Sequence, residues 1–329
     1  MKAWQMQNVG DPWDNLQIAE VDLPSASDVG TRIRVEATDL NFADILQSQG
    51  IYQVKLPIPF TPGMNAAGTV LEAAASSQFK VGDRVIGPTL DQWGGYAEEA
   101  MIVDQQAYLL PDGVSAVTAA GMHITYGTSW FALHHRGQLK PGETILVLAA
   151  AGGVGSSAVQ MAQAHGCLVI AAAGGPEKVQ TCRDLGADYV IDYNAEDLYQ
   201  RVKELTDGRG VDVVYDPVGG DYFDTARRLI AWEGRLLVIG FASGDIPSAP
   251  ANHALVKNYS IVGVHMGGYR ERDPETRKRC YAELHQQLLD GTIDPLVSEV
   301  IGFADLPEGM RRLSKRQTIG RVVFDPTLP

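Results

Sequence analysis

The sequence predicts an α/β protein of two domains, one of them built on a doubly wound parallel sheet. The chain has 329 residues, more than one ordinary core encloses. Residues 1–120 show short strand patterns separated by proline and glycine, whereas strand and helix patterns alternate after about Ala119. Continuous Val/Ile/Leu runs between helices are typical of a parallel sheet buried on both faces, and right-handed crossovers make such a sheet doubly wound.

The first part of the chain is predicted to be rich in strands and turns. Strands are expected at TRIRVEAT (31–38) and AAGTVLEA (66–73). Proline and glycine mark the turns at LPIPFTPG (56–63), KVGDRVIGP (80–88) and QWGGY (92–96). No helical pattern of ten residues dominates this part, which indicates a β-rich domain.

The second part alternates strands with helices. Its predicted strands are 144–150, 168–173, 189–193, 211–218 and 235–242, and two of its predicted helices are 154–166 and 176–187. From about His265 shorter mixed elements follow and end on a predicted strand, GRVVFD (320–325). We expect this last segment to fold back onto the N-terminal domain.

Composition and charge exclude several classes of function. The formal net charge of −13 repels nucleic-acid phosphates and anionic lipid. No apolar run approaches the roughly 20 residues of a membrane span, and the N-terminus lacks the apolar core of a signal peptide. Cys167, Cys182 and Cys280 are scattered, which argues against disulfides or structural zinc. A cytoplasmic protein that binds neither nucleic acid nor membrane is expected.

The stretch ILVLAAAGGVGSSAVQ (145–160) is the most informative in the chain. A strand leads into Ala150-x-Gly152-x-x-Gly155 and then into a helix, which is a dinucleotide-binding motif with alanine in the first glycine position. A diphosphate is attracted by the free N–H groups and positive dipole of the helix N-terminus. A Cβ at Gly152 would block its approach, and one at Gly155 would push the helix off the strand.

The end of the second strand of this domain indicates the cofactor. An acid that holds the adenine ribose is expected about 20 residues after the glycine turn. The region reads AAAGGPEK (171–178), and no carboxylate ends the strand. Gly174, Gly175 and Lys178 therefore favour NADPH over NADH. Glu177 argues the other way unless it faces solvent, and Lys178 has the alternative interpretation of a solvated helix lysine.

Several motifs together resemble a known family. AAAGGVGSSAVQMAQAHG, NFADILQSQGIY (41–52), PFTPGMNAAGTV (59–70) and VDVVYDPVGG (211–220) are similar to the zinc-independent NADPH:quinone oxidoreductases of the medium-chain dehydrogenase/reductase superfamily. The resemblance implies a GroES-like catalytic domain at 1–122, completed by 266–329. It also implies a Rossmann domain at 123–265 and NADPH between the two domains. A homodimer is expected, with a tetramer as the alternative, paired through the edge strand IVGVHM (261–266).

The resemblance also assigns residues to the cofactor. It places Asn41 and Met266 near the nicotinamide and Arg321 near the cofactor. The remaining positions are Thr128 near the phosphates or ribose; Gly152, Gly153, Val154 and Gly155 at the diphosphate; Gly174, Lys178 and Tyr193 at the 2′-phosphate; and Phe241 and Ser243 beside the nicotinamide.

The zinc alcohol dehydrogenases of the same superfamily hold a catalytic metal with two cysteines and a histidine. The matching positions here are Asn41, Met64 and Ala120, and none of these is a usual zinc ligand. The cysteine-rich lobe of those enzymes is also missing. His123, His134 and His135 have no evident partner ligands. No metal is expected.

Without a Lewis acid the easier reaction is hydride addition to an electrophile that delocalises its own charge. A quinone or an α,β-unsaturated carbonyl does so. The protein then supplies orientation and hydrogen-bond donors for the developing oxyanion, for which Asn41 and Tyr52 are candidates. Tyr52 is equally consistent with a packing aromatic, and the final proton could come from solvent.

Two positions depart from the family pattern. Ser48 stands where an arginine is common, and Asn65 stands where a glutamate is common. We expect the two positions to pair, with the ion pair replaced by neutral partners, because one buried charge alone is costly. These departures leave the physiological substrate open.

Two other functions remain as alternatives. One is an enoyl-thioester (CoA) reductase, although the N-terminal domain shows no Lys/Arg cluster for the CoA phosphates. The other is a low-turnover NADPH-binding protein with a sensing or structural role.

Overall fold

The computed structural model describes residues 1–26 and 30–329, which form two compact units. Unit 1 comprises Met1–Ile124 and Val297–Pro329, and unit 2 comprises Thr125–Leu296. The first boundary lies within helix α4 (Ala116–Trp130). In the described part of the chain, no helix has both the length and the apolar character needed to cross a lipid bilayer.

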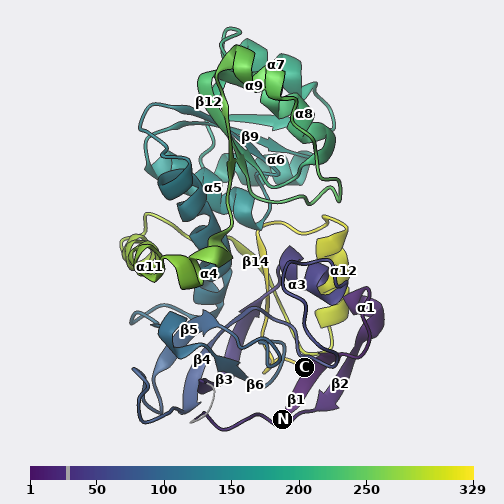
Figure 1. Cartoon of the computed structure of the whole chain (residues 1–329), viewed down its shortest axis with the longest axis vertical. Helices are drawn as coiled ribbons and strands as arrows, with labels where there is room; N and C mark the ends of the chain where they lie inside the picture. Colours follow the sequence, from purple (N-terminus) through teal and green to yellow (C-terminus); the bar gives the residue numbers. More distant parts are fainter. Residues whose placement is uncertain (27–29) are drawn as a thin grey trace. The chain divides into compact units, whose positions relative to one another are not determined.

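Unit 1 is built on a seven-stranded sheet (Figure 1). Its order is β14-β15-β3-β4-β5-β7, with β6 also paired to β3. The β14–β15 pair is parallel and the other neighbours are antiparallel. The strands are β3 (Thr31–Asp39), β4 (Asn65–Glu72), β5 (Arg84–Pro88), β6 (Glu99–Ile102), β7 (Tyr108–Leu109), β14 (Val297–Ile301) and β15 (Arg321–Phe324).

The remaining elements of unit 1 are short. Strands β1 (Lys2–Met6) and β2 (Leu16–Glu20) form a separate antiparallel pair. The helices are α1 (Pro12–Asn15), α3 (Phe42–Ser48), the 3₁₀ turn η1 (Asp104–Gln106) and α12 (Leu306–Ser314). Fully buried Phe60, Phe324 and Leu40 belong to one apolar core, which α3 and α12 help to enclose. The predicted strands 31–38, 66–73 and 320–325 are all present.

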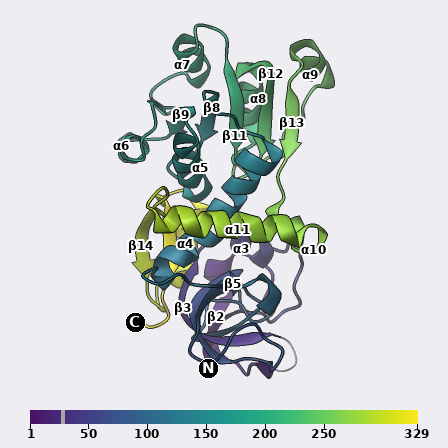
Figure 2. The ribbon, with the colours of Figure 1, turned by 90° about the vertical axis from the view of Figure 1, so that its left-hand side faces the viewer.

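Unit 2 contains a six-stranded sheet in which every neighbouring pair is parallel. The strands are β8 (Thr144–Leu148), β9 (Leu168–Ala173), β10 (Tyr189–Asp192), β11 (Val211–Asp216), β12 (Ile230–Val238) and β13 (Ser260–Gly263). The order is β10-β9-β8-β11-β12-β13, so the chain builds outward from β8 in both directions (Figure 2). This arrangement confirms the predicted doubly wound sheet. The strand order reverses between β8 and β11, which is the point where open α/β sheets bind their ligands.

Five helices of unit 2 connect these strands and pack on them: α5 (Gly153–Ala164), α6 (Pro176–Asp184), α7 (Leu198–Leu205), α8 (Gly220–Leu229) and α9 (Ala251–Lys257). The π-helical segment η2 (Phe131–Arg136) precedes β8, and η3 (Met266–Gly268), α10 (Tyr269–Arg272) and α11 (Pro274–Leu289) follow β13. All five residues of β8 are buried, as expected for the centre of a sheet covered on both faces.

The C-terminal boundary differs from the expected one. Residues 266–329 are predicted to complete the first domain, but in the structure residues up to Leu296 belong to unit 2. Within unit 2 the Phe131 and Tyr269 rings lie 4.2 Å apart, and the Trp130 indole donates to Glu283 at 2.7 Å. Cys280, on the buried face of α11, is inaccessible to solvent. An amphipathic helix that covers these aromatic residues is more stable there than in solvent.

Candidate functional site

The glycine turn after β8 leaves the N-terminus of α5 open. Ala149 adopts a left-handed conformation (φ 48°), and the Gly152 N–H donates to its carbonyl at 2.9 Å. The twelve-residue helix α5 then begins at Gly153. The first N–H groups of a helix have no partner within it and carry the positive end of the dipole, so this turn can bind a diphosphate.

The two motif glycines have different surroundings. A Cβ on Gly155 would lie 2.2 Å from the Ala149 carbonyl oxygen and 2.8 Å from the Ala150 Cα. The predicted close approach of helix and strand at Gly155 is therefore confirmed. A Cβ on Gly152 meets only the Ala149 oxygen, at 3.2 Å, so its outer side is open. The turn fits a dinucleotide, whose diphosphate needs that open side.

The second half of α4 is hydrogen-bonded to the helix that follows the glycine turn. The Ser129 hydroxyl hydrogen-bonds the Ser157 and Tyr215 hydroxyls, both at 2.8 Å, and lies 3.2 Å from the Val154 carbonyl oxygen. Burial raises the pKa of Tyr215, which keeps its phenol neutral. This network fixes α4, α5 and β11 to one another. Thr128, the half-buried neighbour of Ser129, is placed by the same helix.

Two residues predicted at the 2′-phosphate lie together at the end of β9. A Cβ on Gly174 would lie 2.6 Å from the Tyr193 ring, so that ring rests on the glycine backbone. The Tyr193 ring also meets Tyr222 edge-on, with centroids 5.2 Å apart. Lys178 lies in the first turn of α6 and is half-buried, while Glu177 beside it is exposed. Glu177 therefore faces solvent, as NADPH binding requires.

Asp192, a residue that sequence analysis overlooked, ends the neighbouring strand β10. It pairs in register with Ala173, the last residue of β9. Its Oδ1 accepts hydrogen bonds from the Gly175 and Asn194 N–H groups, both at 3.0 Å. Both bonds are accepted by Oδ1, and the bond from the Gly175 N–H fixes the backbone of the Gly174–Gly175 turn. The Asp in VIDY (190–193) is the sequence signal for this residue, because an acid that ends the next parallel strand lies at the same edge of the sheet.

The loops after β11 and β12 pack on each other. Asp216 Oδ1 accepts from the Val218 and Gly219 N–H groups at 2.8 and 2.9 Å, and burial raises the pKa of this carboxyl. A Cβ on Gly219 would lie 3.0 Å from the Phe241 ring. The Ser243 N–H donates to the Val218 carbonyl at 2.9 Å. Phe241 and Ser243 are thus held at the carboxyl edge of the sheet.

Unit 1 contains a buried cluster around Asn41. The Arg321 guanidinium forms an ion pair with Asp39, and its Nη2 donates to Asn41 Oδ1 at 2.9 Å. The Asn41 amide nitrogen donates to Asp39 Oδ1 at 2.9 Å and lies 3.3 Å from the Asp39 carbonyl oxygen. Asn41 is 5% exposed and Asp39 is fully buried. The charge of Arg321 is thus engaged within unit 1, and the Asn41 amide is fixed at both ends.

Asp44, in the first turn of α3, forms a second part of this cluster. Its carboxylate accepts from the Asn41 N–H at 3.0 Å, the Tyr96 hydroxyl at 2.9 Å and the Gly63 N–H at 3.3 Å. Burial raises the pKa of Asp44 to about 7, although the hydrogen-bond donors oppose that shift. The same donors tie the start of α3 to the loop before β4, which fixes the backbone of Asn41.

Comparisons with known proteins agree with this architecture. Residues 27–126 match the model of the alcohol dehydrogenase GroES-like domain, and residues 153–283 match that of zinc-binding dehydrogenases. The chain is 41% identical over 298 residues to quinone oxidoreductase-like protein 2 of Bos taurus, covering 89% of this chain and 84% of that protein. The chain belongs to the quinone oxidoreductase family of the medium-chain dehydrogenase/reductase superfamily.

Solved structures of this family superpose over almost the whole chain. A quinone oxidoreductase of Pseudomonas syringae has a TM-score of 0.91 at 32% identity and covers 99% of both chains. An Escherichia coli quinone oxidoreductase complexed with NADPH has a TM-score of 0.90 at 28% identity, covering 99% of this chain and all of that one.

The expected pairing of Ser48 with Asn65 is wrong. The Ser48 hydroxyl donates to the Asp44 carbonyl of its own helix at 2.8 Å. Asn65 is fully buried at the start of β4, and both polar atoms of its side chain lack a hydrogen-bond partner among the described residues. A short serine side chain in a helix readily bonds the backbone carbonyl four residues before it, so the Ser48 hydroxyl is satisfied locally and not by Asn65.

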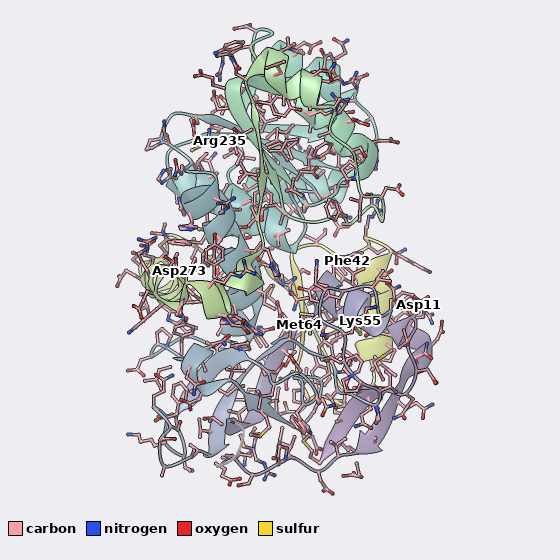
Figure 3. The ribbon with its side chains drawn as sticks, viewed as in Figure 1. Asp11, Phe42, Lys55, Met64, Arg235 and Asp273 are labelled. Carbon is pink, nitrogen blue, oxygen red and sulfur yellow. The ribbon has the colours of Figure 1, made fainter. Side chains whose placement is uncertain are left out.

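The positions that hold zinc in other members of the superfamily carry no ligand side chain here. Met64 (Figure 3) directly precedes β4, Ala120 is fully buried in α4, and the Asn41 amide donates to Asp39. Within residues 1–26 and 30–329, no three or more His, Cys, Asp and Glu side chains are grouped to hold a metal ion. Burial and the neighbouring His165 lower the pKa of His134 to about 4. The absence of zinc stays a prediction.

Two further predicted residues can be placed. Tyr52 is half-buried in the turn after α3, where its N–H donates to the Leu46 carbonyl at 3.1 Å. Met266 begins η3 in unit 2, and its sulfur accepts from Arg277 at 3.2 Å. Their roles at a substrate or a nicotinamide stay predictions.

Proposed function

We propose that this protein is an NADPH-dependent oxidoreductase that transfers hydride to a quinone or an α,β-unsaturated carbonyl. The observation that carries the proposal is the open glycine turn at Gly152, with the Tyr193 ring resting on Gly174. The similarity to quinone oxidoreductases, one of them complexed with NADPH, supports both the cofactor and the substrate class.

The residues of unit 2 hold the cofactor in this proposal. The nicotinamide, when bound, supplies the hydride. Backbone N–H groups at the start of α5 bind the diphosphate, and Lys178 with Tyr193 and Gly174 binds the 2′-phosphate. The proposed cofactor-binding residues of unit 2 are Thr128, Gly152, Gly153, Val154, Gly155, Gly174, Lys178, Tyr193, Phe241, Ser243 and Met266. Asn41 and Arg321 of unit 1 are proposed as cofactor-binding residues as well.

Residues of unit 1 act on the electrophile. The Tyr52 hydroxyl and one N–H of the Asn41 amide are the proposed donors to the oxygen on which negative charge develops. For Asn41 this is the N–H whose present acceptor is the Asp39 carbonyl oxygen, at 3.3 Å, which the substrate oxygen would replace. Asp39 and Arg321 orient the Asn41 amide, because its nitrogen donates to Asp39 and its oxygen accepts from Arg321. Hydrogen-bond donors that are already oriented need little reorganisation when the negative charge develops. Orientation of this kind is sufficient help for an electrophile that delocalises its own charge.

The proposal extends to the assembly and its location. Strand β13 is an edge of the six-stranded sheet, which supports a homodimer paired through this edge. The three cysteines are free and buried, as is common in the reducing cytoplasm.

Lys178 provides the test of cofactor choice. A charge-assisted contact from lysine to phosphate contributes about 1.5–3 kcal/mol, or about 10- to 150-fold in affinity. Lys178→Ala should weaken NADPH binding by that factor and leave NADH nearly unchanged, as measured by fluorescence titration. Arg183→Ala, which removes an exposed cation from the same helix, is the control. Equal losses for both cofactors would show that Lys178 acts through folding.

A single-turnover experiment tests the reaction. Stopped-flow mixing of the NADPH-bound protein with 1,4-naphthoquinone, a 2-alkenal or an enoyl-CoA should oxidise NADPH fastest with the first two. Fastest oxidation by the enoyl-CoA would instead identify a thioester reductase. Tight NADPH binding without oxidation by any of the three would identify a binding protein.

A further inference from the structure

Arg277 is a buried cation in the first half of α11. Its side chain belongs to the buried face of that helix, and the residue is 3% exposed. It is the fourth residue of a helix that begins at Pro274. The N-terminal end of a helix carries a positive partial charge, so a cation in this position gains nothing from the helix dipole.

No carboxylate of the described residues neutralises Arg277. Its Nη1 donates to the Met266 sulfur at 3.2 Å, and its guanidinium carbon lies 4.9 Å from the centre of the Tyr281 ring. Its Nε is buried and has no hydrogen-bond partner in the described part of the chain. Across residues 1–26 and 30–329, no Asp or Glu forms an ion pair with it. A thioether and an aromatic ring do not cancel the charge, and a buried charge left unpaired is strongly unfavourable.

The carboxylates on and beside α11 have other partners or face solvent. Asp273, the N-cap (Figure 3), accepts from the Thr276 N–H at 3.0 Å. Glu275 is exposed, and Glu283 accepts from the Trp130 indole at 2.7 Å and lies 4.0 Å from Arg279. These carboxylates therefore leave the cation at Arg277 without an anionic partner.

The surroundings of Arg277 connect it to residues assigned to the cofactor. A Cβ on Gly127 would lie 2.9 Å from the Tyr281 hydroxyl and 3.7 Å from the Met266 methyl. Tyr281 is fully buried, so its ring is a fixed platform beneath the guanidinium. Gly127 precedes Thr128 in α4, and Met266 itself contacts Arg277. The charge thus lies beside the residues proposed to border the nicotinamide and its ribose.

We propose that Arg277 binds a negatively charged substituent of the electrophile, and that the preferred substrates are anionic quinones or enones. This inference rests on the proposed function. A carboxylate or sulfonate accepts two N–H groups of a guanidinium at once, which supplies the partners that Nε lacks. The phosphates of the cofactor have the separate positions at the glycine turn and at Lys178.

The test uses matched neutral and anionic probes on the full chain. Turnover is measured with 1,4-naphthoquinone and 1,4-naphthoquinone-2-sulfonate, and binding by calorimetry with 2-naphthol and 2-naphthalenesulfonate. The variants are Arg277→Met, which keeps the length and removes the charge, and Arg277→Lys, which keeps the charge. Arg279→Met is the control, because it removes an exposed cation from the same helix.

We expect Arg277→Met to lower kcat/KM for the sulfonated quinone by about 10- to 100-fold, the range of a charge-assisted hydrogen bond. Its affinity for 2-naphthalenesulfonate should fall equally, while both neutral probes change less than about threefold. Arg277→Lys should recover part of the loss. The Tm of Arg277→Met should not fall, because the variant removes an unpaired buried charge.

Three results decide the matter. Equal 2-naphthalenesulfonate affinity in wild type and Arg277→Met overturns the anion site, whatever the turnover assay gives. Weaker NADPH binding in Arg277→Met also overturns it, because the guanidinium would then serve the cofactor. Sulfonate binding that depends on Arg277, in a protein that reduces neither quinone, supports the anion site and overturns the proposed function instead.

Discussion

At the scale of single residues, Asn41 is held by one charge close to it in sequence, Asp39, and by one that is distant, Arg321. Its amide is fixed between Asp39 and Arg321, and Arg321 lies 282 residues from Asp39. The motif around Asn41 is visible in the sequence, but a partner across so long a separation is not. Asp39 and Asp44 flank Asn41 as two aspartates in an apolar stretch, and that was the signal available for a buried polar cluster.

Removing the cation of this cluster should be costly. Arg321→Met leaves the Asp39 carboxylate buried and unpaired, which should lower the free energy of unfolding by about 3–5 kcal/mol. Arg312→Met is the control, since Arg312 pairs with Glu299 at 2.7 Å on a partly exposed surface where such pairs contribute about 0–1 kcal/mol. Urea denaturation measures the free energy of unfolding of both variants. Equal losses would show that the buried Arg321–Asp39 pair contributes no more to stability than the surface pair.

At the scale of elements, the glycine turn combines two different requirements. Gly155 lets the backbone of α5 approach β8, whereas Gly152 leaves open the side from which a diphosphate arrives. The first requirement concerns the stability of the unit, and the second concerns only the ligand. The two positions can therefore be separated by experiment.

Gly155→Ala should lower the stability of the protein, whereas Gly152→Val should lower its affinity for NADPH. The methyl group of Gly155→Ala would lie 2.2 Å from a backbone oxygen, so unfolding should become easier by about 1–3 kcal/mol. Gly152→Val should keep its Tm and lose at least about tenfold in NADPH affinity, or about 1.4 kcal/mol. Thermal unfolding and fluorescence titration measure the two effects. Normal NADPH binding by Gly152→Val would show that the turn is not the diphosphate site.

The strands and helices of unit 2 were predictable because their apolar runs are long and periodic. The residues at which these strands and helices begin and end were less predictable. The predicted helix 176–187 ends at Asp184, and Gly186 just beyond it adopts a φ of 88°. The predicted strand 235–242 is observed as Ile230–Val238. Its start was missed because Trp232 and Glu233 are exposed and Glu233 is left-handed, so this stretch lacks the pattern of a buried strand.

The site residues that belong to a local backbone motif were predictable from the sequence. The site residues whose partners are distant in sequence were not. The glycine turn and Gly174 follow from local sequence. Asp192 and Arg277 do not, because their relevance depends on which strand lies beside β9 and on which side of α11 is buried. The prediction that Ser48 pairs with Asn65 failed for the same reason. The absence of an ion pair at two positions does not predict which hydrogen-bond partners the neutral side chains have instead.

At the scale of the whole molecule, the edge of the sheet in unit 2 leaves apolar side chains exposed. On β13, Ile261 is 41% exposed, and on α9, Leu255 and Val256 are 76% and 71% exposed. An edge strand with free backbone groups and apolar neighbours favours pairing with another chain. The net charge of −13 opposes unspecific association, so a defined partner surface is needed.

The last prediction follows from this edge. Sedimentation equilibrium at micromolar concentration should find the mass of a dimer. The double variant Leu255→Asp, Ile261→Lys should sediment as a monomer, because it puts charges into an interface that excludes water. Val81→Asp, which changes an equally apolar residue that is 68% exposed in unit 1, should remain dimeric. Both variants should keep their NADPH affinity, because the glycine turn lies at β8, in the middle of the sheet. A monomeric wild type, or equal masses for the two variants, would show that β13 is a solvent-facing edge and not an interface.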